Sequence, residues 1–146
     1  FGSDPRVLGR EFSPGVGYPL GAVVGAGLFT HVALAEEMLF RGTLQSSFAR
    51  RTSEMKGWVA SSLLFGLTHT LNAVTMSGEK RSSYLRYGVP FITMTGSYLG
   101  WAYKESQYNL SVPVAIHFWY NFLLSAAFFA ADPQHSPLAA EISIPF

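Results

Sequence analysis

The sequence has no cysteine and few charged residues. Of its 146 residues 13% are Asp, Glu, Lys or Arg, and the formal net charge is +1. Soluble domains carry about 25% charged residues, so this chain has roughly half the usual share. The lack of cysteine excludes disulfide scaffolds, iron–sulfur sites, cysteine zinc sites and thiol nucleophiles. The scarcity of charge argues against a disordered chain, a coiled coil and a nucleic-acid-binding protein, so no nucleic acid is expected as a partner.

The charges that are present lie between long apolar stretches. A helix that crosses the hydrocarbon core of a membrane needs roughly 20 mostly apolar residues. Four stretches of about that length contain no charged residue: 12–35, 57–78, 87–103 and 106–131. The sequence therefore predicts an all-α, polytopic membrane protein with about four transmembrane helices and both termini on the same side. The helices are expected near 16–48, 57–77, 87–104 and 111–131.

This pattern also gives a domain organisation. Residues 1–15 are predicted to be an entry segment, 16–131 the transmembrane domain, and 132–146 a C-terminal tail. The expected localisation is an integral membrane protein, with the lipid bilayer as one partner. A soluble bundle of buried helices is the alternative, but such a domain rarely lacks amphipathic helices altogether. Because the chain begins with Phe rather than Met, we expect it to be a fragment or a processed form.

Glycine and aromatic residues have regular places in the predicted helices. Glycines recur every four residues, a spacing that lets two helices approach closely in lipid, although scattered glycines are an equally good explanation. These glycines are Gly17, Gly21 and Gly25, and then Gly96 and Gly100. Aromatic residues near the helix ends suit the membrane–water interface. They are Tyr18, Trp58, Tyr84, Tyr87, Tyr103 and Tyr108.

Three charged residues follow the first apolar stretch directly: Glu36, Glu37 and Arg41. Glu37 and Arg41 are four residues apart with the acid first, which is the favourable order for an ion pair on a helix. Glu36 is rotated about 100° around the helix from Glu37. Glu36 is therefore not expected to share this ion pair, and its carboxylate is a candidate general base. The alternative is that both glutamates lie among the lipid headgroups and are fully solvated.

Two other predicted helices each carry a histidine and an asparagine on one face. Asn72 follows His69 by three residues, and Asn121 follows His117 by four. Residues at these spacings are neighbours on a helix. A single histidine in an apolar helix is typical of packing. Two such faces on separate helices instead indicate a polar site within the membrane, where polar residues are functional by default.

The expected depths of these groups are similar. If the first helix ends near residue 47, Glu36 lies about 16 Å from that end at 1.5 Å per residue. Helices starting from the same surface near residues 58 and 111 place His69 about 16 Å down, His117 about 9 Å and Asn121 about 15 Å. The sequence thus predicts that four polar groups from three helices meet within the membrane.

These residues resemble the motifs of the CPBP family, which is also called the Abi family. In chain order the motifs are Glu36-Glu37-x-x-x-Arg41, Phe65-x-x-x-His69 and His117-x-x-x-Asn121. The family includes the CAAX prenyl endoproteases and bacteriocin-processing or immunity proteins. The resemblance covers about residues 30–125, and Glu-Glu-Met-Leu-Phe-Arg-Gly is a close match to the first motif of the family. Members usually have further helices before this domain.

The resemblance implies that the protein is an intramembrane endopeptidase acting on a membrane-associated peptide or protein. Glu36 and His69 would activate a water molecule, and His117 and Asn121 would donate hydrogen bonds to the oxyanion. Glu37, Arg41 and Asn72 would be supporting residues. No prenyl-binding determinant is evident in the sequence, so CAAX cleavage stands beside leader-peptide processing as the expected reaction.

Two alternatives remain open. Glu36, His69 and His117 could bind a divalent metal such as zinc, because three nitrogen or oxygen ligands and a water form a catalytic zinc site. The chain has no HExxH helix, and we favour a glutamate mechanism without a metal or other cofactor. The second alternative is a non-catalytic CPBP-like membrane subunit that acts as a scaffold or partner-binding element in a larger membrane complex.

Overall fold

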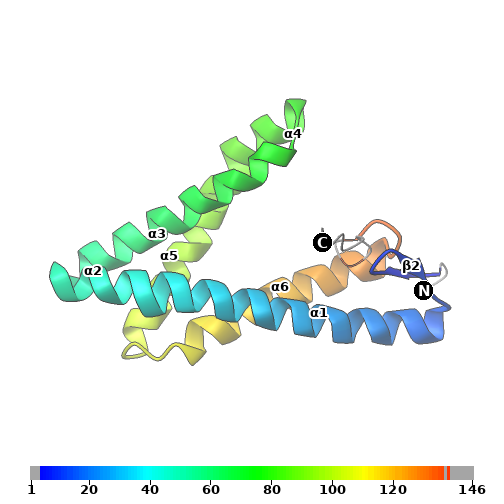
Figure 1. Cartoon of the computed structure of the whole chain (residues 1–146), viewed down its shortest axis with the longest axis horizontal. Coiled ribbons are helices and arrows are strands. Elements are labelled where there is room, and N and C mark those ends of the chain that lie inside the picture. Colours follow the sequence, from blue (N-terminus) through cyan, green and yellow to red (C-terminus); the bar gives the residue numbers. More distant parts are fainter. Residues whose placement is uncertain (1–3, 137, 139–146) are drawn as a thin grey trace, which may run out of the picture. The chain divides into compact units, whose positions relative to one another are not determined.

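The computed structural model describes residues 4–136 and residue 138 (Figure 1). The chain divides into two units, one formed by residues 34–116 and the other by the described residues before and after that range. Helices α1 (Pro14–Glu37) and α6 (Ser111–Ala131) each contribute to both units. The two units are described separately below.

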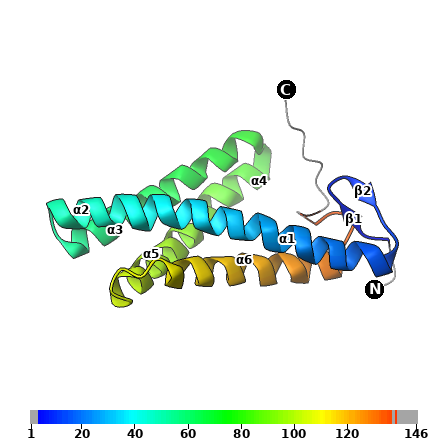
Figure 2. The ribbon, with the colours of Figure 1, turned by 60° about the horizontal axis from the view of Figure 1, so that its bottom comes forward.

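The unit of residues 34–116 is built from helical segments that follow one another closely. The end of α1 continues as a π-helix over Met38–Gln45 and then as α2 (Ser46–Arg51). After a short turn, α3 (Glu54–His69) runs into a 3-10 helix over Thr70–Thr75. The next segment consists of α4 (Gly78–Ser83), a π-helix over Tyr84–Gly88 and α5 (Val89–Glu105). Helices α3 and α5 lie side by side (Figures 1 and 2).

Glycines allow α3 and α5 to approach closely. A Cβ atom on Gly66 of α3 would overlap the Thr93 hydroxyl, and one on Gly96 of α5 would come within 2.5 Å of the Phe65 ring. A Cβ atom on Gly100 would lie 2.7 Å from the Gln45 side-chain oxygen. The glycine spacing in α5 therefore reflects close helix packing rather than scattered glycines.

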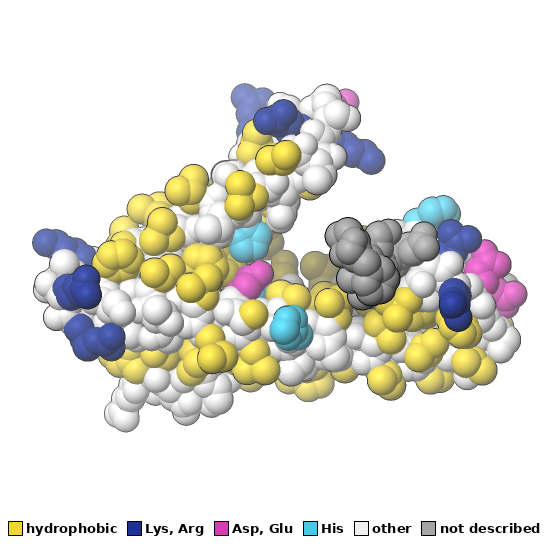
Figure 3. Space-filling model, viewed as in Figure 1, with side chains coloured by type: hydrophobic (Ala, Val, Ile, Leu, Met, Phe, Trp, Pro, Cys, Tyr) yellow, Lys and Arg dark blue, Asp and Glu magenta, His cyan; other side chains and the backbone are white. Residues whose placement is uncertain are grey.

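Several polar side chains are buried in this unit, while many large apolar ones are exposed. The buried set includes Glu37, Arg41, Gln45, Ser61 and Ser62. Along α3 and the following turn, Val59, Leu63, Leu67 and Leu71 are 45–68% exposed at intervals of four residues. Lys and Arg side chains gather at the α2–α3 turn and around α4, and hydrophobic side chains cover the helices between them (Figure 3). This distribution suits helices surrounded by lipid, where apolar faces are solvated and polar groups need partners inside the protein.

The other unit contains a small β-hairpin, the first part of α1 and the second part of α6. Strands β1 (Arg6–Val7) and β2 (Arg10–Glu11) are antiparallel. Leu8 and Gly9 form the turn, with φ angles of 51° and 78°. Backbone hydrogen bonds join Arg6 N–H to the Pro133 carbonyl and Leu8 N–H to the Leu138 carbonyl, both at 3.0 Å.

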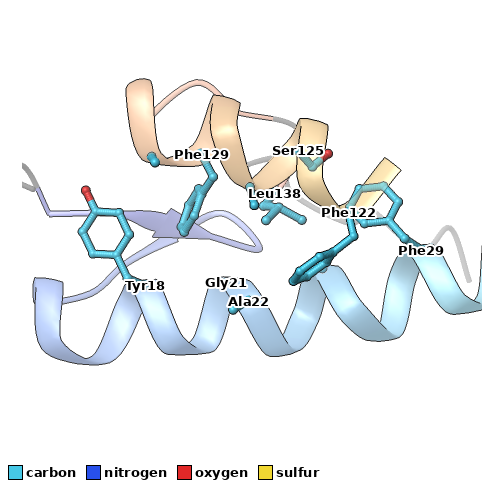
Figure 4. A pocket seen from close by; sticks show the side chains of 11 residues that line it. Tyr18, Gly21, Ala22, Phe29, Phe122, Ser125, Phe129 and Leu138 are labelled. Carbon is cyan, nitrogen blue, oxygen red and sulfur yellow. The ribbon is translucent and has the colours of Figure 1, made fainter. Parts of the chain in front are cut away.

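An apolar cavity of about 190 Å³ lies in this unit. The rings of Phe122 and Phe129 point from α6 into the space next to α1 (Figure 4). Gly21 leaves room for Phe129, because a Cβ atom at this position would overlap the ring. Tyr18 packs edge-on against Phe129, with ring centroids 5.5 Å apart.

The predicted all-α class is confirmed, since every described element apart from the two-residue strands is helical. The helix predicted at 111–131 coincides with α6, and the one predicted at 16–48 lies within 14–51. The helix predicted at 57–77 begins at 54, and its last turns, which end at 75, are 3-10 helix.

The third predicted helix starts too late. Helical structure begins at Gly78 rather than at residue 87, because charged residues end an apolar stretch but do not end a helix. Within the described part of the chain, two helices are long and apolar enough to cross a membrane, Pro14–Arg51 and Ser111–Ala131. The α-helical parts of the other two candidates, α3 and α5, have 16 and 17 residues.

Candidate active site

The first motif contains a buried ion pair. Arg41 Nη1 donates to Glu37 Oε1 at 3.1 Å, and the two side chains are 1% and 0% exposed. Arg41 Nη2 donates to the Gly96 carbonyl at 2.6 Å, and the guanidinium lies 4.5 Å from the centre of the Phe65 ring. The ion pair expected from the spacing is therefore present, and the alternative of a solvated Glu37 is wrong. Arg41 connects all three long helical segments of this unit.

The ion pair lies at the start of the π-helix. Directly after this widened segment, the Ser46 hydroxyl of α2 donates to the Arg41 carbonyl five residues earlier at 3.0 Å. Two further side-chain bonds attach the π-helix to its neighbours. Ser61 of α3 donates to the Phe40 carbonyl at 2.7 Å, and Gln45 donates to the Gly100 carbonyl of α5 at 2.8 Å. Short π-helical segments inside α-helices often occur at functional sites, and here the segment follows Glu36 and Glu37 directly.

The His69 imidazole is held by the preceding turn of α3. Its Nδ1 atom lies 2.7 Å from the Phe65 carbonyl oxygen. Because a carbonyl oxygen can only accept a hydrogen bond, Nδ1 must carry the proton. In the neutral form of the ring the lone pair is then on Nε2, the arrangement that a base or a metal ligand needs. The Phe65 ring packs against the imidazole with centroids 4.6 Å apart and against Phe40 at 5.0 Å.

Asn72 contacts the second motif through a tyrosine. Asn72 Nδ2 donates to the Tyr84 hydroxyl, and the Tyr84 hydroxyl donates to the His69 carbonyl, each at 3.1 Å. Asn72 was expected beside His69 on the same helix face. The structure instead links the two residues through Tyr84 of the π-helix before α5.

Residues 18–123 match the family model described as type II CAAX prenyl endopeptidase Rce1-like. The chain belongs to this family. The match includes all seven candidate site residues and confirms the resemblance drawn from the motifs. No curated protein and no solved structure gave a match.

Membership of this Rce1-like family identifies the chain as an integral membrane protein of a protease family. It also indicates a membrane-associated protein as the substrate. The roles of the individual site residues and the need for a metal stay predictions. Among the described residues, no group of three or more His, Cys, Asp or Glu side chains is arranged to hold a metal ion.

The candidate residues fall in both units. Glu36, in the last turn of α1, and His69, in the last turn of α3, belong to the unit of residues 34–116, and the Glu36 side chain is partly buried. His117 and Asn121 lie one turn apart on α6 in the other unit.

Three aromatic residues make hydrogen bonds that the sequence did not reveal, and one of them, Tyr84, reaches a motif residue. Tyr84, Trp58 and Tyr103 were assigned to the membrane interface, but each makes a hydrogen bond inside the protein. Trp58 Nε1 donates to the Ser97 carbonyl at 2.8 Å, and the Tyr103 hydroxyl lies 3.0 Å from that of Ser46. A tyrosine or tryptophan near a helix end gives the same signal in the sequence whether it faces lipid headgroups or another helix.

Proposed function

We propose that this chain is an intramembrane endopeptidase that hydrolyses a peptide bond of a membrane-associated protein with a water activated by Glu36 and His69. The observation that carries the proposal is the hydrogen bond from His69 Nδ1 to the Phe65 carbonyl. When the imidazole is neutral, this bond leaves Nε2 as the proton acceptor. General acid–base catalysis by a positioned side chain contributes about 10²- to 10⁴-fold in rate.

The proposed reaction divides the work between two pairs of residues. Glu36 and His69 take a proton from water while its oxygen attacks the scissile carbonyl carbon. His117 and Asn121 donate hydrogen bonds to the oxyanion that forms, a type of stabilisation worth about 3–4 kcal/mol per donor. The tetrahedral intermediate then collapses as the C–N bond breaks, and the proton held by Glu36 and His69 passes to the departing amine. The water contributes its hydroxyl to the new carboxylic acid.

We propose that the Glu37–Arg41 pair supports this site by fixing the helix that carries Glu36. The support for this role is geometric. Arg41 bonds at once to Glu37, to the Gly96 carbonyl of α5 and to the face of Phe65. Phe65 is also the residue that holds His69. The guanidinium therefore contacts Glu37, the neighbour of Glu36 in the chain, and Phe65, the hydrogen-bond partner of His69.

The test is cleavage of a fluorogenic CAAX peptide, in prenylated and unprenylated forms, by the protein in nanodiscs. Glu36→Gln keeps the shape of the side chain but cannot take a proton, so it should abolish cleavage while the protein stays folded. His69→Ala should be equally severe. Asn121→Ala should lower the rate by about 10²- to 10³-fold, the usual effect of losing one oxyanion donor. Glu79→Gln, on the exposed helix α4, is the matched control and should cleave normally.

Two outcomes would contradict this mechanism. Inactivation by a strong chelator that zinc reverses would indicate a metal held by Glu36, His69 and His117. Full biological function of the Glu36→Gln variant would mean that the chain works as a scaffold or partner-binding subunit in a larger membrane complex. Cleavage of the unprenylated peptide alone would support the protease and exclude a requirement for the prenyl group.

We further propose that four helices cross the membrane, with both termini on one side. The exposed apolar residues along α3 support this topology, as does the matching series Phe91, Met94, Tyr98 and Trp101 along α5. Because the chain has no cysteine, single cysteines at Asp4 and at the exposed His135 give unambiguous labelling sites. A membrane-impermeant maleimide should label both from the same side. Labelling from opposite sides would rule out four spans.

A further inference from the structure

The carbonyl group of His69 accepts a hydrogen bond from outside its own helix. The donor is the Tyr84 hydroxyl, 3.1 Å away, and Tyr84 in turn accepts a hydrogen bond from Asn72. A phenol has one proton to donate and lone pairs to accept with. With the Asn72 amide on the accepting side, the phenol proton is directed to the His69 carbonyl.

This bond is made where α3 changes its geometry. His69 is the last residue of the α-helix, and the chain continues as a 3-10 helix from Thr70. The final carbonyls of an α-helix lack partners within the regular hydrogen-bond pattern. At this junction the Tyr84 hydroxyl adds a hydrogen bond to the backbone of the residue that carries the proposed base. The imidazole is thus fixed through its ring by Phe65 and through its backbone by Tyr84.

The position of the Tyr84 ring depends on the space left by Gly88, one turn later. Tyr84 opens the π-helix that ends at Gly88. A Cβ atom on Gly88 would lie 2.8 Å from Cδ2 of the Tyr84 ring and would push the ring away. Glycine at this position therefore gives the phenol the space it needs to reach the end of α3.

We propose that Tyr84 is a positioning residue that orients His69 for water activation. The inference rests on the proposed function, because it assigns Tyr84 a task in that reaction. In metal sites, losing the outer hydrogen-bond partner of a ligating histidine typically costs about 10- to 100-fold in affinity or activity, and we expect a loss of similar size for His69. The effect should fall on kcat, because Tyr84 acts through the backbone of His69.

The closing experiment compares Tyr84→Phe with Tyr87→Phe. The first variant keeps the ring and removes the hydroxyl, and the second removes the hydroxyl of a 66% exposed tyrosine on the same π-helix. Tyr84→Phe should lower kcat by about 10- to 100-fold with KM unchanged, and Tyr87→Phe should leave both unchanged. Gly88→Ala, which keeps the hydroxyl but displaces the ring, should lower kcat in the same way as Tyr84→Phe.

A second readout is independent of cleavage. The chain has four histidines, so the ¹⁵N signals of His69 can be assigned by comparison with a His69→Gln variant. In the wild type these signals should report a proton on Nδ1, and in Tyr84→Phe they should broaden or shift. Equal kcat and equal His69 signals in Tyr84→Phe and Tyr87→Phe would overturn the inference, as would a loss of thermal stability at unchanged kcat. If the folded wild type cleaves neither peptide, the proposed function fails. A changed His69 signal in Tyr84→Phe would then still establish the link from Tyr84 to His69.

Discussion

Replacing Arg41 should destabilise the protein more than replacing any exposed arginine. The Arg41 side chain is 1% exposed and faces a Glu37 carboxylate that is 0% exposed, with 3.1 Å between Nη1 and Oε1. Arg41→Ala removes the guanidinium that balances this buried carboxylate. It also removes the donor to the Gly96 carbonyl and the cation on the Phe65 ring.

The expected magnitude follows from the burial of the pair. Breaking a buried ion pair by removing one partner costs about 3–5 kcal/mol. At about 2–4 °C per kcal/mol for a chain of this size class, the unfolding temperature should fall by roughly 6–20 °C. Replacing both residues, as in Glu37→Gln with Arg41→Met, removes the two charges together. The double variant should therefore recover part of the loss, because a buried pair can be replaced by uncharged groups at little cost.

The assay is thermal unfolding in detergent, followed by the fluorescence of the chain's three tryptophans. Arg50→Ala is the matched control, since Arg50 is exposed on the continuation of the same helix. Its loss should change stability by about 1 kcal/mol or less. If Arg41→Ala unfolds at the same temperature as Arg50→Ala, the pair adds no stability and its burial has been misjudged. If the double variant is less stable than Arg41→Ala, the uncompensated carboxylate is not the cause of the loss.

Three further predictions concern packing, hydrogen bonding and titration. Gly96→Ala should lower the free energy of unfolding by about 1–3 kcal/mol, because the new Cβ would lie 2.5 Å from the Phe65 ring. Gly27→Ala is the control in the same denaturation assay and should be neutral or stabilising, because no atom lies within 4 Å of its new Cβ. Ser61→Ala should cost about 1 kcal/mol through the lost 2.7 Å bond to the Phe40 carbonyl, and a similar loss in the exposed Ser83→Ala would contradict this assignment. The hydrogen bond from His135 lowers the pKa of Asp132. His135→Ala should therefore raise the pKa of Asp132 towards its ordinary value in a carboxyl NMR titration. An unchanged titration would show that the contact is absent in solution.

The helices could be predicted from the sequence where the apolar stretch and the helix end at the same residue. Helix α6 is such a case, because Ser111 and Pro113 suit its first turn and Asp132-Pro133 follows its last residue. The segment before α5 is the opposite case. Glu79, Lys80, Arg81 and Arg86 interrupt the hydropathy pattern, but they lie in α4 and the π-helix that follows it. Charge marks the end of a membrane-compatible stretch, whereas only backbone hydrogen bonding determines where a helix ends.

The candidate site could be predicted only as far as its contacts are local. The Glu37–Arg41 pair follows from a spacing of four residues. The π-helix at Met38–Gln45 has no comparable signature, and the bonds that attach it, from Ser61 and to Gly100, involve other helices. The link from Tyr84 to His69 also spans 15 residues and depends on how α3 and α5 pack. The β-hairpin was missed because strands of two residues are too short to show an alternating pattern.

The two adjacent glutamates of the first motif should therefore give opposite phenotypes. Glu37 is fully buried against Arg41, and that guanidinium also bonds to α5. Its replacement by glutamine should lower stability first and activity as a consequence. Glu36 points elsewhere, about 100° around the helix, and its side chain is only partly buried. Its replacement by glutamine should remove activity at unchanged stability, because an amide keeps the packing and loses the base. Helical geometry thus separates a structural carboxylate from a proposed catalytic one at neighbouring positions, and measuring both stability and cleavage for each variant distinguishes the two roles.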